Sequence, residues 1–255
     1  MEADTSFSWR EWYGLARSLL IYYGRPWRAA QLRRFYSQFI QPDDLVYDVG
    51  AHVGSRTRVF ASLGRQVVAI EPQPRFNAFL QNTFSSNPKV ILEPSALGAE
   101  EGEANLLVSQ RTPTVTSLSD EWVSQVRQDG SFAWVEWDKQ LTVPVTTLDA
   151  LIEKHGLPAF CKIDVEGYEL QVLQGLSQPI AALSFEYVQP TMQSSLACID
   201  RLESLGQYGY NLTVGEGLQF VSDTWMEAVE MQTYLKALPA KYASGDIYAR
   251  LVENV

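Results

Sequence analysis

Five acidic residues of this sequence follow apolar, strand-like runs, and they offer the clearest capacity for chemistry. These residues are Asp48, Glu71, Glu93, Asp164 and Glu186. Because the carboxyl ends of parallel strands meet at one edge of an α/β sheet, we expect these carboxylates to surround a single cleft. Carboxylates in such a cleft can accept hydrogen bonds from ribose hydroxyls or take a proton from a substrate hydroxyl.

The stretch from residue 45 to residue 72 is predicted to position the first two of these acids. It reads as a strand, a glycine turn, a helix and a second strand. Gly50 and Gly54 bracket the turn and allow the backbone to approach a ligand closely. The first turn of the helix offers unpaired N–H groups to an anion. Glu71 ends the second strand 23 residues after Asp48, near the spacing of acids that bind ribose.

The glycine turn also bears on which nucleoside ligand is bound. It reads DVGAHVG and lacks the third glycine of a dinucleotide-binding G-x-G-x-x-G turn, which disfavours a pyrophosphate. An acid in this loop suits a ligand with a cationic end, such as the amino acid portion of S-adenosylmethionine. An NAD-dependent oxidoreductase is the alternative enzyme class, because Glu71 suits a ribose in either case.

Three motifs, in this order, resemble those of the FkbM family of S-adenosylmethionine-dependent methyltransferases. They are DVGAHVG at residues 48–54, IEP at residues 70–72 and KIDVEGYE at residues 162–169. The similarity covers roughly residues 43–175, and His52 stands where the family usually carries Asn. The resemblance implies S-adenosylmethionine as cofactor and O-methylation of a small-molecule or glycan acceptor, namely a hydroxyl on a sugar or a secondary metabolite.

Strands alternate with helices along the chain, which predicts an α/β fold with a mainly parallel sheet covered on both faces. The resemblance implies the Rossmann-like, three-layer sandwich of class I methyltransferases, with seven strands. We expect an N-terminal helical extension over residues 1–40 and an S-adenosylmethionine-binding domain over residues 41–255. Within that domain, residues 110–140 read as an irregular insertion that covers the substrate.

The resemblance and the strand-tip positions together assign roles to individual residues. The cofactor is expected to contact Asp48, Gly50, Ala51, His52, Gly54, Glu71, Pro72, Ser95, Ala96 and Asp164. An alcohol acceptor needs a base, for which Asp164 is the first choice, Glu186 the second and Glu166 a further candidate. Thr116, Ser117, Trp122 and Glu169 are expected to contact the substrate. No dedicated metal motif occurs in the sequence, although Asp164 and Glu186 could hold a divalent cation.

Composition narrows the classes of partner. The net charge of −10 argues against nucleic acid or an anionic membrane as the main partner of the whole chain. The two cysteines, Cys161 and Cys198, make no disulfide framework and favour a reducing cytoplasm.

Residues 1–40 differ from the rest of the chain, because they hold six arginines and ten of the thirty aromatic residues. We interpret them as helices packed on the domain or forming a lid, with a homodimer contact or membrane-surface association as alternatives. A further functional hypothesis is a catalytically inactive methyltransferase fold that serves as a binding or membrane-docking module.

Overall fold

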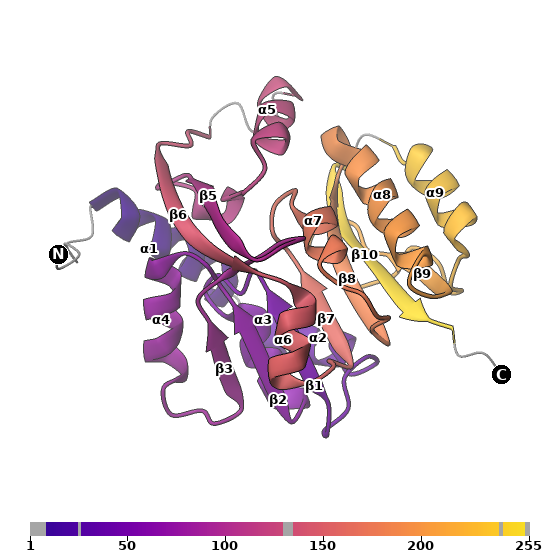
Figure 1. The fold of residues 1–255 in the computed structure, drawn as a ribbon, viewed down its shortest axis with the longest axis horizontal. Helices are drawn as coiled ribbons and strands as arrows, with labels where there is room; N and C mark the ends of the chain where they lie inside the picture. The colour runs from indigo at the N-terminus through magenta and orange to yellow at the C-terminus, as the bar shows by residue number, and fades with distance from the viewer. Residues whose placement is uncertain (1–8, 25–26, 130–134, 240–241, 253–255) are drawn as a thin grey trace.

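The computed structural model describes residues 9–24, 27–129, 135–239 and 242–252, with side chains described from residue 13 onward. Its centre is a seven-stranded sheet in the order β3-β2-β1-β7-β8-β10-β9 (Figure 1). The strands are β1 (Leu45–Val49), β2 (Gln66–Ile70), β3 (Val90–Glu93), β7 (Phe160–Ile163), β8 (Ala182–Val188), β9 (Tyr208–Leu212) and β10 (Ser244–Leu251). Only β10 runs antiparallel to its neighbours, β8 and β9. The predicted mainly parallel, seven-stranded α/β sheet is therefore confirmed.

The sheet is buried on both faces, as its apolar strands predict. Every residue of β1 and β7 is buried. One face packs against α6 (Leu148–His155), α7 (Glu169–Gln174) and α8 (Met192–Glu203), which lie in front of the sheet in Figure 1. The other face packs against α2 (Trp27–Tyr36) and α3 (Ser55–Leu63), which lie behind it. The three layers place every strand tip of the parallel part at one edge.

The helices of the N-terminal segment pack on the sheet domain. Phe35 and Tyr36 of α2 belong to the same apolar cluster as Phe60 of α3 and Phe160 of β7. The preceding helix, α1 (Trp9–Tyr23), packs Leu15 against residues of the glycine turn and of α4 (Pro74–Phe84). The boundary at residue 41 stays a prediction, because these helices share an apolar cluster with the sheet. The described residues contain no helix that is both long and apolar enough to cross a membrane.

The two ends of the predicted insertion, residues 110–140, join a small second sheet. Its strands are β4 (Ala96–Leu97), β5 (Gly102–Val108) and β6 (Lys139–Thr146), in the order β4-β6-β5. Between β5 and β6 the chain forms the short helix η1 (Pro113–Val115) and α5 (Asp120–Asp129). Residues 130–134 of the predicted insertion lie outside the described residues. The remaining elements are η2 (Gln189–Thr191) and α9 (Ala228–Lys236).

Candidate active site

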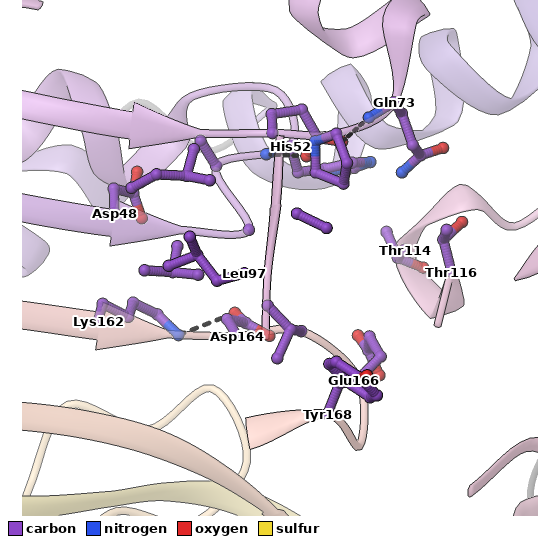
Figure 2. Close-up of a pocket in the computed structure, with 18 of the residues that line it drawn as sticks. Asp48, His52, Gln73, Leu97, Thr114, Thr116, Lys162, Asp164, Glu166 and Tyr168 are labelled. Atoms are coloured by element: carbon purple, nitrogen blue, oxygen red, sulfur yellow. Dashed lines mark hydrogen bonds and ion pairs between the residues drawn. The ribbon is translucent and has the colours of Figure 1, made fainter. Parts of the chain in front are cut away.

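A cleft opens at the carboxyl ends of β1, β2 and β7, where the order of the strands reverses along the sheet. This is the position at which open α/β sheets bind ligands. Figure 2 shows Asp48, Lys162 and Asp164 on one side of the cleft and Thr114 and Thr116, from η1 and its end, on the other. The predicted site residues that line it are Asp48, Gly50, Ala51, His52, Glu71, Pro72, Ser95, Ala96, Thr116, Asp164 and Glu166.

The glycine turn brings the ends of β1 and β7 into contact. Gly50 has φ +84°, and a Cβ atom there would lie 1.9 Å from the carbonyl oxygen of Asp164. Only glycine satisfies both the left-handed backbone and this close approach. Gly54 was also predicted to contact the cofactor, but it does not line the cleft. It precedes α3 with φ +74° and packs tightly against Phe84 and Leu80 of α4, so its small size serves helix packing.

The Glu71 carboxylate lies at the tip of β2 and is tied to the adjacent backbone. Oε2 accepts a hydrogen bond from the His52 N–H and Oε1 accepts one from the Gln73 N–H, both at 2.9 Å. Burial raises the pKa of Glu71 to about 7, although these two hydrogen bonds oppose the shift. A carboxylate held in this way keeps spare lone pairs that can accept hydrogen bonds from a ribose diol.

His52 joins the glycine turn to the N-terminal helix. It has φ +50°, and its Nε2 lies 3.4 Å from Oγ of Ser18. Its ring packs against Phe76 with centroids 4.2 Å apart and meets Tyr22 edge-on at 5.7 Å. Burial lowers the pKa of His52 to about 4, so the imidazole is neutral at pH 7. Since Tyr22 itself lines the cleft, α1 forms part of the wall of the site.

Asp48 forms the floor of the cleft and anchors α3. Asp48 is 2% exposed, and its Oδ2 accepts a hydrogen bond of 2.5 Å from the Thr57 hydroxyl. Burial raises the pKa of Asp48, and this hydrogen bond opposes the shift. The bond holds the first turn of α3 beside the cleft, where its N–H groups lack intrahelical partners.

Lys162 and Asp164 form an ion pair at the end of β7. The Lys162 ammonium donates to Oδ2 of Asp164 at 2.8 Å and to Oδ1 of Asp246 at 3.4 Å. Burial alone would raise the pKa of Asp164, but the adjacent ammonium outweighs burial and holds it below its ordinary value. Asp164 therefore stays ionised in the physiological range, and its side chain is 34% exposed where it lines the cleft.

Glu166 and Glu186 complete a cluster of three carboxylates with Asp164. One oxygen from each lies within 4.8 Å of the others. Burial, together with the charges of Asp164 and Glu169, raises the pKa of Glu166 well above its ordinary value. Burial and the charge of Glu166 act in the same way on Glu186, although Glu186 does not line the cleft. Such a cluster can share a proton or bind a divalent cation.

The loop that carries Glu166 is held in a strained conformation by three residues predicted to contact substrate. Glu166 itself has φ +53°, a left-handed conformation that non-glycine residues rarely adopt. Ser117 donates a 2.6 Å hydrogen bond to the Glu166 carbonyl, and Oε1 of Glu169 accepts from the Gly167 N–H at 3.1 Å. Trp122 packs directly on Gly167. None of the three lines the cleft, so the structure places them as supports of the loop.

Glu93 and Trp122 make contacts outside the cleft. Glu93, at the tip of β3, turns toward α6, where Lys154 Nζ and His155 Nε2 lie 2.7 and 2.6 Å from its Oε1. Trp122 is buried in an apolar cluster with Val115, Val126 and the half-buried Trp137, which anchors α5 on the small sheet. The segment between β5 and β6 thus has an apolar core of its own.

Several residues of the cleft were missed by the sequence reasoning. They are Tyr22, Ser55, Arg56, Gln73, Thr114 and Tyr168, together with apolar residues such as Leu97, Leu106 and Leu118. Ser55 and Arg56 follow the glycine turn directly, so the helix N-terminus was a signal for them. Nothing in the local pattern distinguishes Tyr22, because its place in the site depends on how α1 packs.

Three polar atoms of the cleft point to a bound ligand. Oγ of Ser95, Oγ1 of Thr116 and Nε of Arg56 are buried and have no hydrogen-bond partner among the described residues. Buried polar groups in folded proteins are nearly always paired, so these atoms require a partner from outside the chain. The cleft also offers groups for a nucleoside that carries an amino acid: Glu71 suits the ribose, the α3 N-terminus suits the carboxylate, and Leu97 and Ile70 offer apolar surface to the base.

Two relatives of this chain are named as methyltransferases. Hexuronic acid methyltransferase AglP of Haloferax volcanii is 26% identical over 172 residues, which are 64% of this chain and 65% of the relative. The 2-O-methyltransferase NoeI of Sinorhizobium fredii is 25% identical over 167 residues, 62% of this chain and 67% of the relative. The chain therefore spans about two thirds of the length of these curated relatives.

The chain is also similar to a solved structure and to one family profile. The crystal structure of methyltransferase FkbM from Methylobacillus flagellatus is 14% identical, has a TM-score of 0.49, and covers 85% of this chain and 50% of its own. The profile of the methyltransferase FkbM domain matches residues 48–236, which hold the cleft, the carboxylate cluster and most of the sheet. The resemblance carried by the three motifs is thus confirmed, and the chain belongs to the FkbM methyltransferase domain family.

Proposed function

We propose that the chain is an S-adenosylmethionine-dependent O-methyltransferase that methylates a hydroxyl group of a sugar or a related small molecule. The observation that carries the proposal is the set of unpartnered polar atoms of Ser95, Thr116 and Arg56 in a cleft that also contains Glu71. Family membership supports methyl transfer, the name of AglP supports a sugar acid as acceptor, and the name of NoeI supports transfer to a hydroxyl oxygen.

The residues of the chain divide between holding the cofactor and preparing the acceptor. Glu71 would accept hydrogen bonds from the ribose, and the N–H groups of Ser55 and Arg56 would bind the cofactor carboxylate. When bound, S-adenosylmethionine supplies an electrophilic methyl group, so the protein needs to contribute mainly orientation. Holding the acceptor oxygen close to that methyl can supply roughly 7–11 kcal/mol of the barrier.

We place the general base at Glu166, ahead of Asp164. Asp164 is bound by the Lys162 ammonium, which lowers its pKa and makes it a weak base. Glu166 lines the cleft, and burial and neighbouring acids raise its pKa well above its ordinary value, which makes it the stronger base of the two. The proton of the acceptor hydroxyl would pass to Glu166, while Asp164 accepts a hydrogen bond and orients the acceptor. Glu186 would share the proton within the cluster.

Calorimetry with S-adenosylhomocysteine tests the cofactor assignment. The wild-type chain should bind it, and Glu71→Ala should weaken binding by roughly 10²-fold, because hydrogen bonds to a carboxylate are lost. The absence of binding heat would contradict the proposal. Measuring the binding of NADH in parallel tests the alternative of an NAD-dependent oxidoreductase.

Mass spectrometry of reactions with uronic-acid and neutral sugars then tests the acceptor. A methyl group found on a sugar oxygen would support the proposal. A chain that binds the cofactor without transferring a methyl group to any acceptor would support the inactive binding module instead.

A further inference from the structure

Helix α1 is apolar on two sides, and only one of them is covered. Its inner side places Leu15, Ser18 and Tyr22 against the glycine turn and the cleft. Its outer side exposes Tyr13, Leu20 and Ile21, of which Leu20 is 74% exposed. An apolar helix surface of this kind normally lies against another apolar phase.

The charge of this segment is opposite to that of the rest of the chain. Residues 12–42 contain five arginines and no aspartate, glutamate or lysine, although the whole chain has a net charge of −10. Trp27, which begins α2 after residues 24–26, is 62% exposed, and Arg33 and Arg34 of the same helix are also exposed. Aliphatic, tryptophan and arginine side chains together are typical of helices that lie at an anionic membrane surface.

We propose that α1 and α2 dock the protein on the surface of an anionic phospholipid bilayer. Arginines attract the anionic headgroups, while Leu20, Ile21 and Trp27 enter the boundary between headgroups and acyl chains. The proposal goes beyond methyl transfer and does not depend on it.

A second copy of the chain fits this surface less well. In a two-fold contact each copy presents the same patch, so the arginines of one copy would face those of the other. A nucleic acid would leave Leu20 and Ile21 without a role, because phosphate contacts need polar donors. A bilayer surface satisfies both the charge and the apolar side chains.

Docking in this way would have a consequence for the site. Tyr22 lines the cleft while Leu20 and Ile21 of the same turn are exposed, so one helix carries both the docking surface and part of the cleft wall. With side chains, a helix is about 10 Å across. The cleft would therefore lie close to the level of the headgroups, where an acceptor attached to a lipid can reach it.

Vesicle sedimentation with the full chain tests the proposal. The protein should pellet with phosphatidylcholine vesicles that contain phosphatidylglycerol and remain in the supernatant with phosphatidylcholine alone. Leu20→Glu should reduce the bound fraction by roughly tenfold, because a charge replaces the most exposed aliphatic side chain of the face. Replacing Arg33 and Arg34 by glutamine should reduce binding by roughly fivefold for each arginine at low salt.

Val229→Glu is the matched control. Val229 is also 74% exposed, but it lies on α9, at the opposite end of the molecule from α1 (Figure 1). This variant should bind vesicles as the wild type does. Equal loss of binding in Val229→Glu and Leu20→Glu, or a wild-type protein that stays in the supernatant, would overturn the proposal. A dimer in sedimentation velocity that Leu20→Glu dissociates, without vesicle binding by the wild type, would assign the surface to a second copy.

Discussion

The ammonium of Lys162 lies 2.8 Å from Oδ2 of Asp164 and leaves Glu166 as the cleft carboxylate with a strongly raised pKa. The Lys162 ammonium lowers the pKa of Asp164, whereas burial and neighbouring acids raise the pKa of Glu166. This difference separates their expected roles, since Asp164 remains a fixed negative charge and Glu166 is the carboxylate with the higher affinity for a proton.

Glu166→Gln should therefore lower turnover by about 10²–10⁴-fold, because it removes the base while keeping the size of the side chain. Its affinity for S-adenosylhomocysteine should change little.

Asp164→Asn should instead destabilise the protein by up to about 3 kcal/mol, because it leaves the Lys162 charge buried with Asp246 as its remaining acidic partner among the described residues. Steady-state kinetics and chemical denaturation distinguish the two effects. The same assays with a chelator test whether the cluster uses a cation, in which case turnover would fall in the wild type.

The pH dependence of turnover should follow the carboxylate cluster. The raised pKa of Glu166 means that this residue is protonated, and unable to accept a proton, at acidic pH. Turnover at saturating substrate should thus rise with pH until Glu166 ionises. In Glu166→Gln this acidic limb should disappear, whereas a limb that persists unchanged would assign the base elsewhere.

Glu71 makes cofactor binding and stability depend on pH in opposite directions. Its pKa of about 7 means that it loses its negative charge as the pH falls, so affinity for S-adenosylhomocysteine should decrease below pH 7. Because this folded-state pKa exceeds the ordinary value of 4.5, its contribution to stability is complete below pH 4.5 and is lost as the pH rises through 7. The rise in the pKa of Glu71 from 4.5 to about 7 is equivalent to about 3 kcal/mol of folding free energy. Thermal unfolding of wild type and Glu71→Gln between pH 5 and pH 8 would reveal this contribution as the difference in slope.

Gly50→Ala should abolish cofactor binding. A Cβ atom at this position would collide with the Asp164 carbonyl and would also require a left-handed backbone. The matched control is Gly215→Ala, because Gly215 has φ +53° but no atom within 4 Å of the added Cβ. The control should lose about 1–2 kcal/mol from backbone strain alone and keep its affinity for S-adenosylhomocysteine. If both variants had the same affinity for S-adenosylhomocysteine, the close approach of Gly50 to the Asp164 carbonyl would not matter for cofactor binding.

His52→Asn should loosen α1 without disrupting the glycine turn. Asparagine tolerates the left-handed backbone of this position, and the N–H that binds Glu71 is retained. The contacts with Ser18, Tyr22 and Phe76 would be lost. We expect faster proteolysis or hydrogen exchange within residues 13–24, with cofactor affinity within a few-fold of the wild type. A large loss of affinity would instead place the imidazole in direct contact with the cofactor.

The sequence alone determined the sheet, its approximate strands and the position of the cleft. Apolar periodicity and glycine turns act over a few neighbouring residues, so they place Asp48, Glu71 and Asp164 at strand tips without knowledge of distant contacts. The three motifs added the family, which the comparison confirmed. The roles of individual side chains in the cleft stay predictions.

Only the tertiary structure decided which neighbours each side chain has. Ser117 and Glu169 support the Glu166 loop, Trp122 packs on Gly167, and Tyr22 walls the cleft from a helix that precedes the glycine turn. These contacts join segments far apart in the chain, and no local pattern records which pairs meet. The same holds for the ion pair of Lys162 and the proton affinity of Glu166, because burial and neighbouring charge determine a pKa and both arise only when the chain is packed.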